Sequence, residues 1–466
     1  MARIKILHIT LGIPKLRAGG LINYSYSIAK AQYNQGHEIA IFYPGHYDLV
    51  NKKSRIKGVS KVEGFSIYEL VNPSYVAVPL GIKEPNLFLQ EGNDNDYRVF
   101  LEKIKPDLIH IHTFMGFHGE FFDVIKHYPA PVVYTTHDYY TICPKTSMIN
   151  EKNELCECAN SEACARCNAD CNNSFILQYV LQSKWYPRLK QSSFMKSLKK
   201  RRKSTATVSE VNGSTANATM SITAETVSQY RKLLDRFEQN FSCVDIVHCN
   251  STVTEQVYKQ QLKNKKHFVL NITSEGITDQ RKNVAELPYH RVGKVNIGFI
   301  GIRDFHKGYS ILRDAGEILS DKGYDFTISF YGDEFNIDNE RYPFCREMGM
   351  FPHDKLNEVC GTIDLMVIPA FWFETFGFAT LEAIANGVPV LASVHTGAKD
   401  LLNDIEKEHV FEPIAEKLAD MIAFYLDDPA RLDKAREDQK NLTPVFSMKK
   451  HNVQLMNAIE KYTNKN

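Results

Sequence analysis

Short runs of apolar residues alternate with segments of helical periodicity along most of the chain. Apolar and β-branched runs of this length predict buried strands. The strands predicted for a first sheet are 4–10, 37–45, 107–113, 131–138 and 267–273. Those predicted for a second sheet are 295–301, 326–332, 365–370 and 389–393. Apolar strands that alternate with helices are typical of parallel sheets covered on both faces, so the pattern predicts an α/β protein.

The length of 466 residues exceeds the roughly 250–300 at which single cores stop growing, so we expect two Rossmann-like lobes with a cleft between them. The segment 274–294 is polar and lacks sustained periodicity, which places the lobe boundary there. We expect an N-terminal lobe over 1–285 and a C-terminal lobe over 286–442. The pattern of 443–466 predicts a helix that packs either on the second lobe or back on the first.

The alternation of strands and helices breaks within the first lobe, over 172–228. We interpret this segment as an insertion, mobile in part, because its second half is rich in Ser, Thr and Ala and almost free of charge. Its first half has nine Lys and Arg residues between 184 and 203, interleaved with aromatic residues. Such a composition suits an anionic membrane surface, and a solvated basic loop is the alternative. Both interpretations stay open.

The net charge of +1 gives no global field that would recruit a polyanion, so no nucleic-acid partner is expected. The N-terminal stretch has about five apolar residues before Gly and Pro interrupt it, too few for a signal-peptide core. No stretch approaches the ~18 apolar residues of a membrane span. We expect a cytoplasmic protein, with peripheral association at the inner face of the membrane as a second option.

The stretch "AFWFETFGFATLEAIANG" (370–387) is typical of a strand, a loop and a short helix that ends before Gly387. Its loop lies at the carboxyl end of a parallel strand, where such sheets bind ligands. The residues that would present free backbone N–H groups to a phosphate are Thr375, Phe376, Gly377 and Phe378. Gly377 would let the phosphate approach closely. Glu374 and Glu382 would accept hydrogen bonds from the vicinal hydroxyls of a sugar or ribose.

This motif resembles that of retaining, nucleotide-sugar-dependent glycosyltransferases of family four, which have the GT-B fold. That family carries E-x-F-G-x-x-x-x-E-A followed by G-x-P-V, and "ETFGFATLEAIANGVPV" matches it throughout. The resemblance spans about 4–402, outside the insertion. It implies that Glu374 contacts the transferred sugar, that Glu382 contacts the nucleotide ribose, and that catalysis requires no metal or other cofactor.

A second motif, "FIGIRDFHKGYSIL" (299–312), places Arg303 and Lys307 after a predicted strand. Two cations at a strand end can neutralise a departing diphosphate. The family pattern G-R-x-x-x-x-K-G is matched at Gly301, Lys307 and Gly308. Its Arg position holds Ile302, so Arg303 is displaced by one residue.

In the first lobe, Gly19 and Gly20 separate a strand from a helix. Glycine serves many such turns for backbone reasons alone, but the pair also matches the family's Gly-Gly turn, which implies a place near donor phosphate and acceptor. His137 ends a strand, where it could exchange a proton with an acceptor hydroxyl. The resemblance favours that role over a structural one. His110 and His112 alternate on one strand face and are interpreted as structural.

Six of the ten cysteines lie between Cys143 and Cys171, and without a signal peptide this clustering favours metal or thiol chemistry over disulfides. The candidate ligands of a structural zinc ion are Cys143, Cys156, Cys164 and Cys167. Some members of the family carry a similar cysteine-rich insertion. Bound zinc and free thiols both stay open.

Two other motifs are given less weight. The sequence "DND" (94–96) resembles an Asp-x-Asp metal site but is expected in a solvated loop. A glycosidase acid pair would straddle a scissile bond, and hydrolysis would need neither Lys307 nor two nucleotide-type lobes.

The sequence therefore predicts a glycosyltransferase that moves a sugar from a nucleotide diphosphate donor, UDP- or GDP-linked, to a glycan or lipid-linked acceptor. Surface-polysaccharide assembly is the expected context. The alternatives are a non-catalytic scaffold or partner subunit with the same fold, and a nucleotide-sugar epimerase.

Overall fold

The computed structural model describes residues 3–14, 16–17, 19–48, 50–77, 81–157, 159–171, 179, 183, 222–281 and 294–463. The basic stretch expected between 184 and 203, the Ser/Thr-rich run and Cys158 lie outside these residues. By its internal contacts the chain divides into two compact units. The first comprises Met1–Tyr134 and Asp138–Asp245, and the second Thr135–His137 and Ile246–Asn466.

An eight-stranded sheet has the strand order β3-β4-β2-β1-β5-β6-β7-β8. Its strands are β1 (Lys5–Ile9), β2 (Glu38–Pro44), β3 (Arg55–Val62), β4 (Phe65–Val71), β5 (Leu108–Ile111), β6 (Val132–Thr135), β7 (Ile246–Cys249) and β8 (Lys266–Val269). Strands β4, β2, β1, β5 and β6 pair in parallel, as do β7 and β8, whereas β3 pairs with β4 antiparallel. The expected strands correspond to β1, β2, β5, β6 and β8; β3, β4 and β7 were not predicted.

A six-stranded parallel sheet has the order β11-β10-β9-β12-β13-β14. Its strands are β9 (Val295–Ile300), β10 (Phe326–Tyr331), β11 (Cys345–Gly349), β12 (Leu365–Ile368), β13 (Val390–Ser393) and β14 (Val410–Phe411). The four strands expected for a second sheet are β9, β10, β12 and β13. The α/β fold with parallel sheets is therefore confirmed.

The helices connect these strands along the chain. Those before β9 are α1 (Gly20–Asn34), η1 (Pro85–Phe88), α2 (Asp94–Ile104), α3 (Gly119–Lys126), α4 (Ser161–Cys167), α8 (Ala224–Phe241) and α9 (Thr252–Leu262). Those that follow are η2 (Phe305–Lys307), α11 (Tyr309–Asp321), η3 (His353–Lys355), α12 (Leu356–Cys360), α13 (Phe378–Ala385), η4 (Gly397–Ile405), α14 (Glu406–His409), α15 (Ala415–Asp427), α16 (Ala430–Asn441) and α17 (Met448–Thr463). Within the described residues, no helix combines the length and apolar character that crossing a membrane requires.

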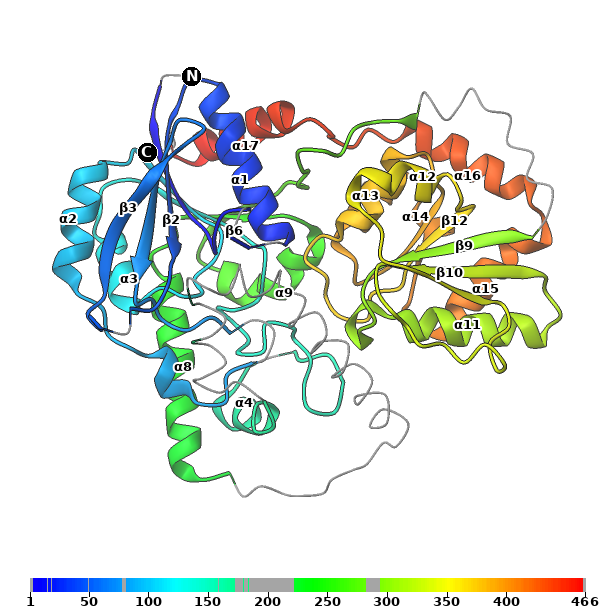
Figure 1. The fold of residues 1–466 in the computed structure, drawn as a ribbon, viewed down its shortest axis with the longest axis horizontal. Coiled ribbons are helices and arrows are strands. Elements are labelled where there is room, and N and C mark those ends of the chain that lie inside the picture. The colour runs from blue at the N-terminus through cyan, green and yellow to red at the C-terminus, as the bar shows by residue number, and fades with distance from the viewer. Residues whose placement is uncertain are drawn as a thin grey trace. The chain divides into compact units, whose positions relative to one another are not determined.

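The six-stranded sheet is buried on both faces, and β12 shows how (Figure 1). Alternate residues of a strand point to opposite faces. Leu365 and Val367 belong to a core formed with α11, α15 and α16. Met366 and Ile368 belong to a second core, formed with α12 and α13. A strand that is covered on both faces has apolar residues at consecutive positions, and this pattern is why β12 could be predicted from the sequence.

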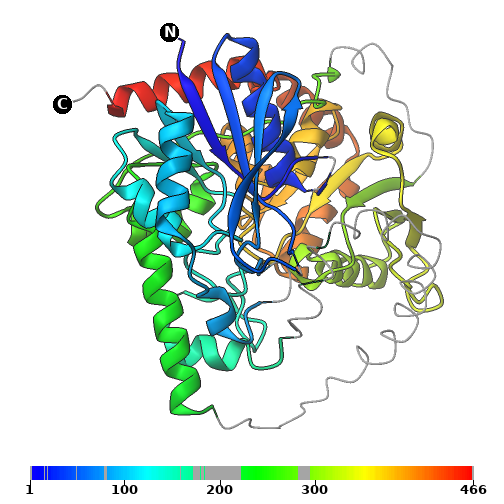
Figure 2. The ribbon, with the colours of Figure 1, turned by 60° about the vertical axis from the view of Figure 1, so that its left-hand side comes forward.

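In the first unit, α3 and the long helix α8, green in Figure 2, lie side by side. Arg236 of α8 donates to Asp123 at 2.8 Å and to Glu120 at 3.1 Å, both in α3. Because the three side chains are less than about a third exposed, this bridge is better shielded from solvent than a surface ion pair.

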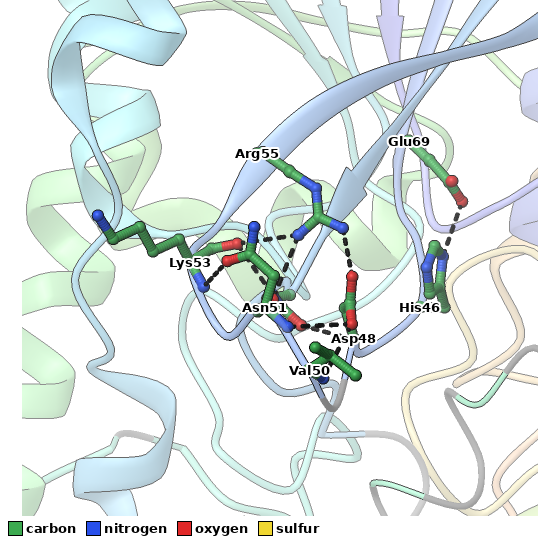
Figure 3. Close-up of polar contacts among 8 residues, drawn as sticks. His46, Asp48, Val50, Asn51, Lys53, Arg55 and Glu69 are labelled. Carbon is green, nitrogen blue, oxygen red and sulfur yellow. Dashed lines mark hydrogen bonds and ion pairs between the residues drawn. The ribbon is translucent and has the colours of Figure 1, made fainter.

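The loop that follows β2 is held by its own polar network (Figure 3). The Asp48 carboxylate accepts from the amides of Val50 and Asn51 at 3.0 and 3.2 Å and also pairs with Arg55. His46 contacts the Glu69 carboxylate of β4 at 3.2 Å. These bonds order the loop at the carboxyl end of β2.

The last helix, α17, packs on β7 and β8. Tyr462 donates its hydroxyl to the carbonyl of His267 at 3.0 Å, and its ring stacks on Phe268. The ring centroids of His451 and His248 also lie 6.2 Å apart, with the ring planes tilted by 39°. The C-terminal helix expected from the sequence is therefore present, and it covers strands of the eight-stranded sheet.

Buried histidines make the fold sensitive to acid. Burial lowers the pKa from 6.5 to about 4 for His8, His118 and His248 and to about 3 for His137 and His451. The unfolded chain takes up these protons near pH 6.5 and the folded chain does not. Each histidine therefore lowers stability by roughly 1.4 kcal/mol per pH unit as the pH falls below about 6.5.

We therefore expect the thermal unfolding midpoint to fall between pH 7 and pH 5, as measured by circular dichroism. Burial raises the pKa of Asp138 and Asp364 to about 6, so the folded chain takes up these two protons more readily than the unfolded chain. These carboxyl groups therefore raise stability on acidification, but they are fewer than the five histidines. His118→Gln should flatten the pH dependence, whereas His127→Gln, at an exposed position, should leave it unchanged. A midpoint that rises on acidification would contradict this expectation.

The turn from β9 into α11 depends on a glycine. Gly308 has φ +72°, and a Cβ at this position would collide with the backbone carbonyl of Pro369, which follows β12. Gly323 has a similar φ of +82° but open space around it. A side chain would strain the backbone at both positions, but only at Gly308 would it also collide with a neighbouring atom.

Gly308→Ala should therefore destabilise the protein by more than Gly323→Ala, for which we expect about 1 kcal/mol from backbone strain alone. Chemical unfolding of both variants measures the difference. Equal losses would show that the contact with Pro369 does not constrain the turn.

Candidate active site

Two loops at the carboxyl edge of the six-stranded sheet carry the predicted site residues. One loop follows β9 and contains η2, and the other follows β12 and leads into α13. Because β9 and β12 are paired neighbours, their loops emerge side by side. The amide of Phe371 donates to the carbonyl of His306 at 2.9 Å, which joins the loops directly. The structure thus brings together two motifs that lie about 70 residues apart in the sequence.

The centre of the site is an ion pair between Lys307 and Glu374. Glu374 is only 7% exposed, while the Lys307 side chain is one third exposed. The ammonium group also lies over the ring of Trp372, 5.5 Å from its centroid. Removing one partner of a pair this buried would leave an uncompensated charge. No chemical role for Trp372 was predicted from the sequence, and only its proximity to Lys307 identifies it.

The backbone of Glu374 is fixed by the segment that follows β13. Its amide donates to the carbonyl of His395 at 2.9 Å, and its carbonyl accepts from the amide of Gly397 at the same distance. His395 in turn uses Nδ1 to contact the carbonyl of Phe371 at 2.7 Å. These contacts hold Glu374 in place without occupying its carboxylate. None of the residues from this third segment was singled out from the sequence.

The start of α13 offers backbone donors, as the sequence predicted. Gly377 occupies the N-cap position with φ +88° and supplies no side-chain cap. Within the described part of the chain, the amides of residues 375 to 378 donate to no protein acceptor. A Cβ at Gly377 would lie 2.8 Å from Oε2 of Glu374 and 2.9 Å from Cγ2 of Thr396. The glycine is therefore needed to seat Glu374 as well as to expose the amides.

Glu382 lies on α13 and is half-buried. Burial raises the pKa of its carboxyl group, and the electrostatic effect of the nearby His353 opposes this shift. No protein donor among the described residues satisfies this carboxylate. A half-buried acceptor without a protein donor is suited to ligand hydroxyls.

Arg303 is oriented by other groups. Its amide donates to Asp333 at 3.1 Å, and its Nε contacts the hydroxyl of Tyr309 at 3.4 Å. The guanidinium group lies 5.9 Å from the centroid of the same ring. The one-residue displacement seen in the sequence therefore coincides with a guanidinium group held against Tyr309.

His137 is half-buried at the end of β6, and its carbonyl accepts from the Thr375 hydroxyl at 3.4 Å. Burial, with a smaller contribution from His248, lowers the pKa of His137 to about 3, so its imidazole is neutral near pH 7. A neutral imidazole can donate or accept a hydrogen bond but is a weak base at this pKa. Gly19 and Gly20 lie exposed at the start of α1, in the other compact unit. Gly19 has φ +140°, and a Cβ there would meet no atom within 4 Å.

Of the candidate zinc ligands, Cys143 lies among turns before the hairpin bridge between Ile149 and Leu155, Cys156 directly follows that bridge, and Cys164 and Cys167 lie on α4. Burial raises the pKa of the Cys143 thiol, opposed by hydrogen bonds from the amides of Met148 and Lys145 among others. Burial also raises the pKa of Cys164 to about 12 and that of Cys167 to about 11, with neighbouring thiolates adding to the shift at Cys164. Backbone N–H groups that donate to a cysteine sulfur stabilise the thiolate form. Burial destabilises the thiolate unless a metal ion neutralises its charge.

Among the described residues, one group of three potential metal ligands has all its ligand atoms within 4.8 Å of one another, namely His8, His110 and His112. Nδ1 of His8 contacts Nε2 of His112 at 3.1 Å, and its Nε2 contacts Gln32 at 2.8 Å. These contacts join His8, His112 and Gln32 in a buried chain, and the ring centroids of His110 and His112 lie 4.1 Å apart. The structural role expected for His110 and His112 stays a prediction.

The "DND" sequence is helical, so the expectation of a loop was wrong. Asp94 and Asp96 form the first turn of α2, where Asn93 caps the helix by accepting from the amide of Asn95 at 3.0 Å. Acidic side chains are favoured at a helix N-terminus because they oppose the helix dipole. Their position is thereby explained without a metal.

Two family models match the chain. The model described as "Glycosyl transferases group 1" matches residues 290–442, and the model described as "Glycosyltransferase Family 4" matches residues 18–157. Together they cover more than half of the chain. The first contains Lys307, Glu374 and Glu382, and the second contains Gly19, Gly20 and His137.

Curated relatives match in part. Protein CapJ of Staphylococcus aureus is 26% identical over 215 residues, which are 42% of this chain and 51% of that protein. The 2-deoxystreptamine glucosyltransferase of Streptomyces kanamyceticus is 26% identical over 185 residues, 35% of this chain and 46% of that protein. The chain thus spans about half the length of the curated relatives it matches.

Among solved structures, the Anabaena protein Alr3699/HepE in complex with UDP superposes with a TM-score of 0.51. The match covers 98% of this chain and 100% of that one at 14% sequence identity, which supports the fold alone. The strand topology, the two family models and this likeness agree, and the chain belongs to the group 1 glycosyltransferases with the GT-B fold.

Proposed function

We propose that this protein is a retaining glycosyltransferase that transfers a hexosyl group from a nucleotide diphosphate sugar to an acceptor hydroxyl in glycan assembly. The Lys307–Glu374 pair beside the free amides of α13 is the observation that carries this proposal. A cation and a helix N-terminus suit a diphosphate, and a buried carboxylate suits sugar hydroxyls. The name of one relative, a glucosyltransferase, supports a hexosyl group, and the UDP bound to Alr3699/HepE supports a nucleotide donor.

The chemistry would proceed at the anomeric carbon of the donor sugar. Its bond to the diphosphate oxygen breaks while the acceptor oxygen bonds to the same face. The acceptor proton passes to the departing phosphate oxygen. Lys307 and the amides of residues 375 to 378 would stabilise the negative charge that develops on this leaving group. A donor diphosphate would compete with Glu374 for the ammonium of Lys307.

The two glutamates would position the donor without taking part in proton transfer. Glu374, already oriented through its backbone, would accept from hydroxyls of the transferred sugar. Glu382, on the same helix whose start would bind the phosphates, would accept from the ribose hydroxyls. The neutral imidazole of His137 would hydrogen-bond the acceptor. A glycan or lipid-linked acceptor is part of the proposal.

Lys307→Ala should lower turnover by about 100-fold, because it removes a charge that stabilises the leaving group. Glu382→Ala should instead weaken donor binding by about tenfold, because it removes hydrogen bonds to the ribose. Thermal shifts with a panel of UDP and GDP sugars identify the donor, and product analysis by mass spectrometry and NMR gives rate and stereochemistry.

Glu437→Ala on α16 is a matched control, since its side chain is exposed and, among the described residues, pairs with the nearby Lys440 alone. It should leave both measurements unchanged. Full activity and donor affinity in Glu382→Ala would refute the assigned role of Glu382. Donor binding without transfer would favour a scaffold, and conversion of the donor sugar to its epimer would favour an epimerase.

We also propose that zinc joins the hairpin closed by Ile149 and Leu155 to α4 through Cys143, Cys156, Cys164 and Cys167. Protein purified without added metal should contain about one zinc per chain by elemental analysis. Cys164→Ser with Cys167→Ser should lose it, whereas Cys345→Ser, in the second sheet, should retain it. Metal-free protein with unchanged stability would exclude the zinc.

A further inference from the structure

A cavity of about 480 Å³ opens at the edge of the first sheet where its parallel strands begin. Its charged and polar lining includes Arg3, Lys5, Glu38, Lys61, Ser66 and Lys103. Lys5 and Glu38 are the first residues of β1 and β2. This amino-edge cavity lies entirely in the first compact unit, and no residue of the proposed glycosyl-transfer site lines it.

The amino-edge cavity carries an excess of positive charge. Glu38 is its one carboxylate and already serves two cations, Arg3 at 3.0 Å and Lys5 at 3.2 Å. Lys61 and Lys103 also line it, and neither has a carboxylate within 4.0 Å among the described residues. Four cations against one carboxylate leave three positive charges in the lining.

Neutral groups complete the amino-edge cavity. The Lys103 ammonium lies 5.8 Å from the centroid of the Tyr68 ring, which keeps it at the cavity wall. The Tyr33 side chain packs against the turn between β3 and β4. Gly64 in this turn has φ +91°, and a Cβ at Gly64 would collide with the Tyr33 hydroxyl. Hydroxyl groups of Tyr33, Ser66 and Tyr68 are therefore available beside the cations.

Repulsion among gathered cations is relieved when an anion lies between them. Ammonium groups bind phosphate as point charges, and guanidinium groups bind it with two parallel N–H donors. The volume falls within the roughly 300–1,000 Å³ of small-ligand sites. A single carboxylate would neutralise only one of the three charges, whereas a phosphate monoester or diphosphate neutralises two or more.

We propose that the amino-edge cavity binds a phosphorylated ligand, with Lys61 and Lys103 as its principal contacts and Arg3 and Lys5 as supporting ones. Two sources share this chemistry, a soluble phosphate ester and the headgroup of an anionic lipid. The proposal does not rest on glycosyl transfer, because the two sites share no residue.

The test uses the full chain carrying Lys307→Ala, so that the proposed donor site does not contribute. Inorganic pyrophosphate is titrated by calorimetry, and sedimentation measures binding to vesicles with and without phosphatidylglycerol. Lys61→Gln with Lys103→Gln should weaken pyrophosphate binding, vesicle binding or both by about tenfold or more. A matched pair at exposed lysines of the same unit, Lys126→Gln with Lys232→Gln, should bind like the parent.

The outcomes separate the two sources. A loss confined to pyrophosphate supports a soluble phosphate ester, and a loss confined to phosphatidylglycerol vesicles supports a lipid headgroup. Equal binding of parent and Lys61→Gln/Lys103→Gln in both assays overturns the proposal, as does an equal loss in the matched pair. Thermal unfolding of each variant confirms that it is folded before the comparison is made.

Discussion

The ion pair between Lys307 and Glu374 is the interaction on which the candidate active site depends. It joins the loops after β9 and β12, which the parallel sheet already places side by side. Burial makes the pair costly to break, since either charge alone would be left in a poorly solvated position. The remaining features, from the exposed amides of α13 to the anchored backbone of Glu374, are arranged around this contact. A donor diphosphate would enter a site whose positive charge is already in position.

Two glycines allow the backbone to come this close. Gly308 brings the turn before α11 against the carbonyl of Pro369, and Gly377 leaves room for the Glu374 carboxylate. Both have positive φ, which side chains with a Cβ rarely adopt. The two glycines of the family motifs therefore have a steric explanation in this structure, because a Cβ at either position would collide with the loop that carries Glu374. The phosphate-binding role expected for Gly377 is compatible with this, because the same missing side chain serves both purposes.

Some elements could not be predicted because their residues lack a clear apolar pattern. β3 is an edge strand with charged and polar residues along its length, and in β4 the apolar residues are interrupted by Ser66 and Glu69. β11 is largely exposed, and β14 has only two residues, so neither gives a periodic signal. In contrast, β1, β9 and β12 are central strands whose largely apolar sequences were sufficient to predict them. At Asp94 the charged composition suggested a loop, yet a capped helix begins there.

The sequence by itself determined the α/β class, the two motifs that contain Lys307 and Glu374, and the helix that starts at Phe378. Local pattern suffices for these because strand burial, helix capping and glycine turns act over a few residues. Only the tertiary structure decided that Lys307 pairs with Glu374, that Trp372 covers it and that Arg303 lies against Tyr309. It also gathered the cations of the amino-edge cavity from three separate segments. Strand order controls the contacts of Lys307 with Glu374 and Trp372 and the gathering of the cavity cations, and it is a property of the whole sheet that no short stretch of sequence specifies.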